Sequence, residues 1–116
     1  MKKDSKGINI MIAKTPEPPY YTVIFTSTLV EAVDGYFEMN AKMKELVTKQ
    51  DGFIGLDGLR AEIGITVSYW KDLESIKKWK ANAEHIAAQN MGKSKWYNTF
   101  KIRIAKVEID YDFERE

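Results

Sequence analysis

The chain has 116 residues, of which 44% are hydrophobic and 30% charged, a composition typical of one globular domain with its own core. Its net charge of +1 gives no electrostatic basis for binding nucleic acid or an anionic membrane. The absence of cysteine excludes disulfides, thiolate metal sites and cysteine nucleophiles. No segment approaches the roughly 20 apolar residues that cross a bilayer, so we expect a cytoplasmic protein without a membrane-spanning helix.

The N-terminal segment precedes the predicted domain. The short apolar run from Ile8 to Ala13 could form an edge strand, and it is too short for the apolar part of a signal peptide. The three prolines between Thr15 and Pro19 favour an extended linker, because proline lacks a backbone donor and biases the preceding residue away from helix. We therefore expect an N-terminal segment (1–19), a domain (20–113) and a polar tail (114–116).

Four segments of the domain have the composition and alternation of β-strands: Tyr20 to Leu29, Phe53 to Arg60, Ala61 to Trp70, and Phe100 to Phe113. In the last segment the apolar residues change phase after Ile104. A shift by one residue is typical of a β-bulge, so we expect one there.

Two segments have apolar residues at helical spacing. The first helix is expected to begin after Asp34, whose carboxylate can accept from the first-turn amides, and to end near Lys49. The second is expected to begin after Asp72 and to continue, unbroken, to a loop at Asn90 to Lys95. The resulting order is β-α-β-β-α-β, with one additional N-terminal strand if Ile8 to Ala13 forms one.

This order predicts an α+β, ferredoxin-like split βαββαβ fold, in which both helices cover one face of an antiparallel sheet. Apolar residues occur on both faces of several strands; Ile24, for example, alternates with Val23 and Phe25. We therefore expect a homodimer in which a second subunit covers the other face.

Candidate binding residues cluster around the second predicted helix. Trp79 lies on its apolar stripe, Trp70 comes just before the helix, and Trp96 follows it. A polar stripe is expected beside the apolar one on an unbroken helix: Asn82, His85 and Gln89. Large aromatic residues next to polar side chains indicate a pocket for a flat, apolar ligand.

Each candidate also has a purely structural interpretation. Trp79 could simply pack in the core, and Trp70 and Trp96 could seal the core or an interface. His85 could be a surface histidine or a general base, but with no second ligand it does not indicate a metal site.

Arg60 and Arg103 could polarise a substrate oxyanion or face water. Among the strand glycines, Gly55, Gly58 and Gly64 indicate bulges or close approach by another backbone or a ligand.

The chain resembles the antibiotic biosynthesis monooxygenase superfamily over the predicted core, roughly from Tyr20 to Phe113. The resemblance depends on the order and spacing of a few short motifs: Tyr69-Trp70, Trp79 with His85, Gly92 with Trp96-Tyr97, and Val107-Glu108 with Tyr111-Asp112-Phe113. It implies a dimeric ferredoxin-like domain with a ligand cleft between the helices and the sheet of each subunit.

The resemblance implies two chemistries: cofactor-free oxygenation of aromatic compounds, and oxidative haem degradation. Haem-degrading members place an axial histidine ten residues after a tryptophan, whereas the residue ten after Trp79 is Gln89. We therefore expect an enzyme without cofactor or metal, with His85, Trp79 and Asn82 as catalytic residues and Trp70, Gln89 and Trp96 as ligand-binding residues. The alternatives are a non-catalytic binding or stress-related domain, and a haem-binding protein without the usual axial histidine.

Overall fold

The structure, a computed structural model, describes residues 12–115. Four antiparallel strands form one sheet in the order β2-β3-β1-β4. The strands are β1 (Tyr20–Leu29), β2 (Phe53–Arg60), β3 (Gly64–Trp70) and β4 (Tyr97–Val107). The predicted ferredoxin-like α+β fold is therefore confirmed. The edge strand expected at Ile8 to Ala13 falls largely outside the described residues, and Ile12 and Ala13 are not in a strand.

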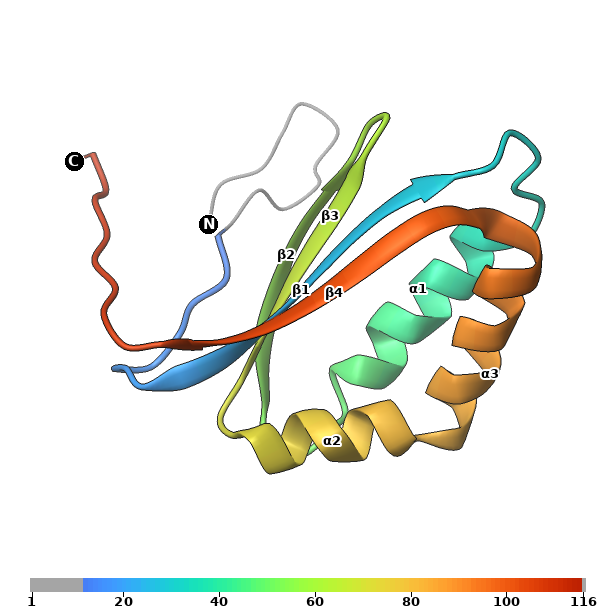
Figure 1. Cartoon of the computed structure of the whole chain (residues 1–116). Coiled ribbons are helices and arrows are strands. Elements are labelled where there is room, and N and C mark those ends of the chain that lie inside the picture. Colours follow the sequence, from blue (N-terminus) through green and yellow to red (C-terminus); the bar gives the residue numbers. More distant parts are fainter. Residues whose placement is uncertain (1–11, 116) are drawn as a thin grey trace.

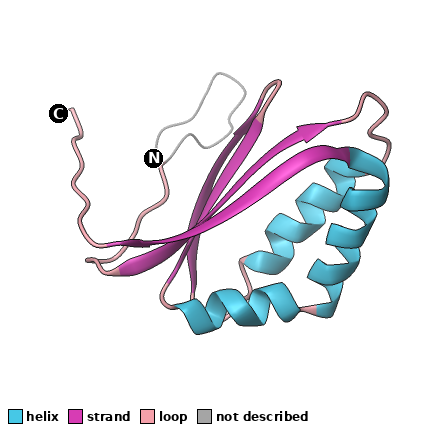
Figure 2. Ribbon diagram, in the orientation of Figure 1, coloured by secondary structure: helices cyan, strands magenta, loops and turns pink. Residues whose placement is uncertain are grey.

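The helices all lie on one face of this sheet, as Figures 1 and 2 show. They are α1 (Tyr36–Val47), α2 (Leu73–Ala81) and α3 (Ala83–Met91), followed by one π-helical turn, η1 (Gly92–Trp96). None of the helices in the described part of the chain is long and apolar enough to span a membrane. We call the face that the helices cover the inner face and the opposite one the outer face.

The register of the strands decides which side chains reach the helices. Val23 in β1 is paired with Ser68 in β3 and with Ile104 in β4. Paired residues of antiparallel strands point to the same face, and Val23 packs against the buried cluster of Val47 and Ile76 from the helices, so this row lies on the inner face. The core lies at one end of that face, where Trp70 is 0% exposed and packs with Val47 and Ile76 from two helices.

The predicted second helix is not continuous, so that prediction is wrong. The backbone of Asn82 is extended (φ −62°, ψ 128°), which ends α2 and starts α3. At the start of α2, the predicted cap is confirmed, since Asp72 Oδ1 accepts from the Ser75 amide at 2.8 Å. The loop expected at Asn90 to Lys95 is also wrong, because the chain stays helical through η1.

Two other boundaries differ from expectation. The N-cap of α1 is Gly35, not Asp34, and no side chain caps this helix. The expected bulge after Ile104 is absent, because β4 stays in regular register with β1 through Ala105 and Val107, which lie on the opposite face from Ile104. The register shift in this pair lies instead between Thr28 and Leu29 of β1.

The outer face holds the extended segments that flank the sheet. The Tyr20 hydroxyl donates to Asp110, just beyond the end of β4. Tyr69 donates to Asp57 at 2.9 Å, and the same carboxylate accepts from the amide of Ala13 at 2.8 Å. Beyond Asp110 the chain leads away from the sheet (Figure 1).

We predict that Trp70→Ala costs about 3–5 kcal/mol of the free energy of unfolding, since it removes the side chain at the centre of the core. Trp79→Ala should cost clearly less, because Trp79 is half-buried and borders a cavity. Urea denaturation of both variants measures the difference. Equal losses would show that Trp79 is an ordinary core residue.

Candidate functional site

A cavity of about 690 Å³ lies between the inner face of the sheet and the helices. Its walls are mostly apolar and aromatic, as is usual for small-molecule sites. Trp79, His85 and Gln89 border it from α2 and α3, while Tyr36 and Arg60 border it from α1 and β2. Two groups of side chains define the site: a tryptophan–histidine pair near the core, and an aromatic group around Arg60 further along the sheet.

The tryptophan–histidine pair consists of two stacked rings. The ring centres of Trp79 and His85 are 4.2 Å apart and their planes differ by 12°. Trp70 lies next to Trp79, with ring centres 6.4 Å apart and planes at 30°. A rigid aromatic surface of this kind suits a flat ligand.

The backbone fixes the tautomer of His85. Its Nδ1 lies 3.0 Å from the carbonyl oxygen of Trp79. Because a carbonyl can only accept, Nδ1 carries the hydrogen, and in the neutral ring Nε2 is left as the proton acceptor. Burial lowers the pKa of the His85 imidazole, which outweighs the opposite effect of the hydrogen bond to Trp79. The ring is therefore neutral at pH 7 and suited to act as a base.

Asn82 positions this histidine from the N-terminus of α3. Its Oδ1 accepts from the amides of Glu84 (3.0 Å) and His85 (3.1 Å), so it is the N-cap of the helix. Asn82 does not border the cavity. The predicted polar stripe of Asn82, His85 and Gln89 therefore does not exist, because the helix breaks at its first member.

The remaining predicted residues divide between the cavity and the core. Gln89 and Trp96 border the cavity. Trp96 is buried and its Nε1 donates to the carbonyl of Asp34 at 2.9 Å, which joins η1 to the start of α1. Trp70 lies in the core and does not border the cavity.

The aromatic group at the other end includes residues that the sequence did not mark as a site. The Tyr36 ring packs edge-on against Trp96 and Tyr97, with ring centres 5.8 and 6.0 Å apart. Burial and the neighbouring Tyr36 raise the pKa of the Tyr97 phenol, which therefore stays protonated. Arg60 lies over the Tyr36 ring, its Cζ 5.5 Å from the ring centre. Tyr36 lies at the start of α1, and nothing in the sequence places it beside Arg60.

Within residues 12–115, no group of three or more histidine, cysteine, aspartate or glutamate side chains is arranged to hold a metal ion. The polar groups that border the cavity are one imidazole, one guanidinium, two lysine ammonium groups, two carboxamides, and tyrosine, serine and threonine hydroxyls. They can bind a polar aromatic compound and accept one proton from it.

Comparison with solved structures identifies the class of fold. The chain aligns with SnoaB, a cofactor-independent oxygenase from Streptomyces nogalater, at a TM-score of 0.69 and 13% identity, covering 80% of this chain and 97% of SnoaB. A candidate antibiotic biosynthesis monooxygenase from Nitrosomonas europaea aligns at 0.65 and 13% identity, covering 84% of this chain and 96% of that one. The chain thus has the fold of the antibiotic biosynthesis monooxygenase superfamily, as the resemblance predicted.

The sequence comparison is more specific. No family model matches the chain. It is 44% identical over 99 residues to YqjZ, an uncharacterized protein of Bacillus subtilis (strain 168), and the match covers 84% of this chain and 87% of YqjZ. The chain therefore belongs to the same family as YqjZ.

We predict that the pKa of His85, the only histidine in the chain, lies below its ordinary value of 6.5. The unfolded chain then takes up the proton first as the pH falls. The contribution of the neutral imidazole to stability should be complete above pH 6.5 and should decline as the pH falls towards the lower pKa of the folded protein.

Titration of the imidazole by NMR measures this pKa directly. Trp79→Ala, which uncovers one side of the ring, should bring the value back towards 6.5. A pKa of 6.5 or higher in the wild-type protein would contradict the buried, neutral histidine.

Proposed function

We propose that this protein is a cofactor-independent monooxygenase that acts on a small aromatic or quinone-like compound bound in the cavity. The observation that supports this most strongly is the pair formed by Trp79 and His85. It combines a flat surface for an aromatic ring with a neutral base whose free nitrogen is fixed by the hydrogen bond at Nδ1. The similarity of the fold to that of SnoaB supports the same class of reaction.

In this mechanism, His85 Nε2 removes a proton from an acidic carbon or phenol of the substrate. The resulting carbanion reacts with O2 to form a carbon hydroperoxide, and loss of water leaves a ketone. The substrate supplies the electrons, so the reaction consumes one O2 and releases one water. Trp79 binds the aromatic rings, and Gln89 and Trp96 complete the cavity wall.

Asn82 then acts on the reaction only through His85. It was expected among the catalytic residues, but its carboxamide oxygen is engaged by two backbone amides. Trp70 similarly supports Trp79 from the core. Both are positioning residues in this proposal.

We predict that the protein accelerates O2 uptake by anthrone, whose CH2 group between two aromatic rings is acidic, and that anthraquinone is the product. His85→Gln should slow this reaction by about a hundredfold or more, as expected for loss of a general base. Asn82→Ser is the matched control, because serine is also a good N-cap and should leave most of the activity.

The anthrone assay and a titration with haemin distinguish the two alternatives. Anthrone binding without O2 uptake above the spontaneous rate would support a non-catalytic binding domain. A stoichiometric haemin complex with a shifted Soret band, lost in His85→Ala, would support the haem alternative. If Asn82→Ser is as inactive as His85→Gln, Asn82 takes part in the chemistry itself.

A homodimer is part of the same proposal. The outer face carries exposed apolar side chains, including Leu59 and Ile65. The segment after β4 carries three more exposed hydrophobic side chains, at every second position: Ile109, Tyr111 and Phe113. A second subunit would cover these surfaces, which are unusually apolar for a monomer.

We predict that sedimentation at micromolar concentration gives twice the 13.4 kDa mass of the chain. Ile65→Glu should dissociate the dimer, because Ile65 is 45% exposed on the outer face. Ile86→Glu is the control, since Ile86 is similarly exposed (43%) but lies on α3. A monomeric wild-type protein, or equal effects of the two substitutions, would contradict an interface formed by the outer face.

A further inference from the structure

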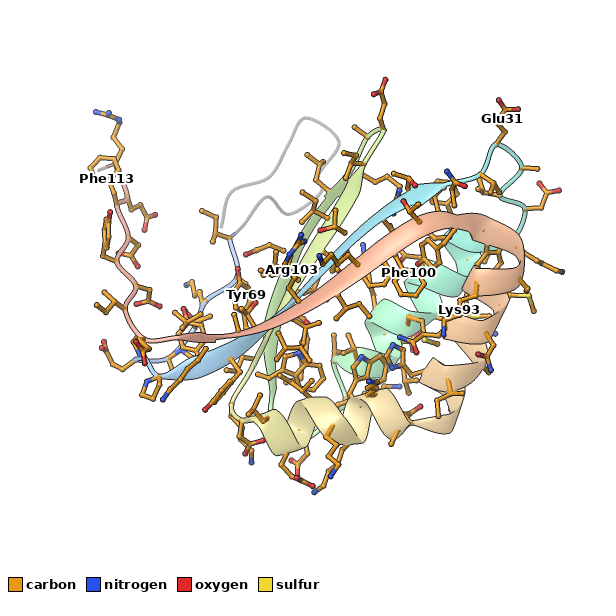
Figure 3. All side chains as sticks on the ribbon, viewed as in Figure 1. Glu31, Tyr69, Lys93, Phe100, Arg103 and Phe113 are labelled. Atoms are coloured by element: carbon orange, nitrogen blue, oxygen red, sulfur yellow. The ribbon has the colours of Figure 1, made fainter. Side chains whose placement is uncertain are left out.

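One row of residues crosses all four strands at the end of the cavity that is far from His85. Arg60 of β2 is paired with Gly64 of β3, Gly64 with Ser27 of β1, and Ser27 with Phe100 of β4. Arg60 and Phe100 both border the cavity, so the whole row lies on the inner face. Figure 3 labels Phe100 in this row, and Arg103 on the same strand.

Arg60 crosses the neighbouring strand to reach Ser27. Its Nη1 lies 3.5 Å from the carbonyl oxygen of Ser27, and its Nη2 donates to the Ser27 hydroxyl. The guanidinium passes over Gly64, where a Cβ atom would lie only 2.2 Å from Arg60 Cζ. A side chain at position 64 would therefore displace the guanidinium, so Gly64 leaves the space that Arg60 uses to reach Ser27.

The cavity is lined by cations without anions, and Arg60 has no counter-charge among the described residues. Three of the residues that border the cavity are cationic, Lys44, Arg60 and Lys80, and none of those described is an aspartate or glutamate. No ion pair involves Arg60 within residues 12–115. Close by, Lys93 Nζ lies 6.0 Å from the Phe100 ring. Arg60 is half-buried, and its hydrogen-bond partners among the described residues are neutral, whereas a cation withdrawn from water usually has an anionic partner.

We propose that the cavity selects an anionic aromatic compound, whose carboxylate binds to Arg60. This inference rests on the proposed aromatic ligand of the cavity and specifies its charge. Two of the five N–H donors of a guanidinium are engaged with Ser27, which leaves others for a ligand oxygen. The protonated hydroxyl of Tyr97 is a further donor in this part of the cavity.

The strand pairing shows that the tryptophan–histidine pair and Arg60 lie at different positions along the sheet. Trp70, which supports the tryptophan–histidine pair, is opposite Tyr21 of β1, whereas Arg60 interacts with Ser27 of the same strand. Six residues of strand span about 20 Å. Between these ends, Phe25 stacks on Phe100 with ring centres 5.5 Å apart and provides an apolar wall.

Binding of a matched pair of probes tests the proposal. The probes are 2-naphthoate and 2-naphthamide, which have the same ring system and differ in charge. Wild-type protein should bind the naphthoate more tightly, as measured by isothermal titration calorimetry. In Arg60→Gln the ratio of the two affinities should fall by about tenfold or more, as expected when a charged hydrogen bond is lost.

Arg103→Gln is the control, because Arg103 is paired with Ile24 and so lies on the outer face. It should leave the ratio unchanged. Equal affinities of wild-type protein for both probes would overturn the charge selection, and this result does not depend on the folding of any variant. Equal effects of Arg60→Gln and Arg103→Gln would also overturn it.

The experiment separates this inference from the proposed reaction. Neither probe has an acidic C–H group, so binding does not depend on turnover. If the naphthoate is preferred but anthrone is not oxidised, the charge selection holds and the oxygenase proposal fails. If neither probe binds, the aromatic site and the charge selection are both wrong.

Discussion

The candidate site depends on the break between α2 and α3. In a continuous helix, the carbonyl of Trp79 would accept from the backbone amide four residues later. Here α2 ends, and the amide of Asn82 donates to that carbonyl at 3.0 Å. The same oxygen also accepts a hydrogen bond from Nδ1 of His85. The change in chain direction brings residue 85 back over the ring of residue 79, which the spacing in a straight helix would not allow.

This arrangement links three properties of His85 to one backbone feature. The hydrogen bond at Nδ1 selects the tautomer, the stacked Trp79 excludes water, and the resulting desolvation lowers the pKa. Asn82 stabilises the break by capping α3. Orientation, protonation state and burial of the imidazole are therefore consequences of ending one helix and starting another.

The sequence predicted the sheet well because strand alternation is a local signal. The inner-face positions of β1, such as Val23 and Phe25, follow directly from alternation once the strand is recognised. The helix break was missed because neither glycine nor proline marks it, and the apolar spacing continues across it. Asn82 followed by Glu84 is compatible with a helix N-terminus, but the same residues also fit a helix interior.

The sequence marked Arg60 as a residue that could polarise a substrate oxyanion, but the side chains that surround it could not be identified from the sequence. Arg60 and Gly64 are close in the chain, but Ser27, Tyr36 and Tyr97 come from three other elements. The alternation of β2 places Arg60 on the inner face, where an arginine contradicts the apolar pattern. That local conflict is a recognisable signal, since residues that break a pattern often mark functional positions.

The two ends of the cavity have complementary chemical properties. At one end a neutral imidazole accepts a proton and so creates negative charge on the ligand, and at the other a guanidinium stabilises negative charge. In an apolar cavity, the attraction of a cation for such an anion is stronger than in water. Arg60 can therefore hold the anionic group of a ligand at its own end of the cavity. The imidazole lies at the opposite end, where its stacking on Trp79 places it beside the aromatic part of the same ligand.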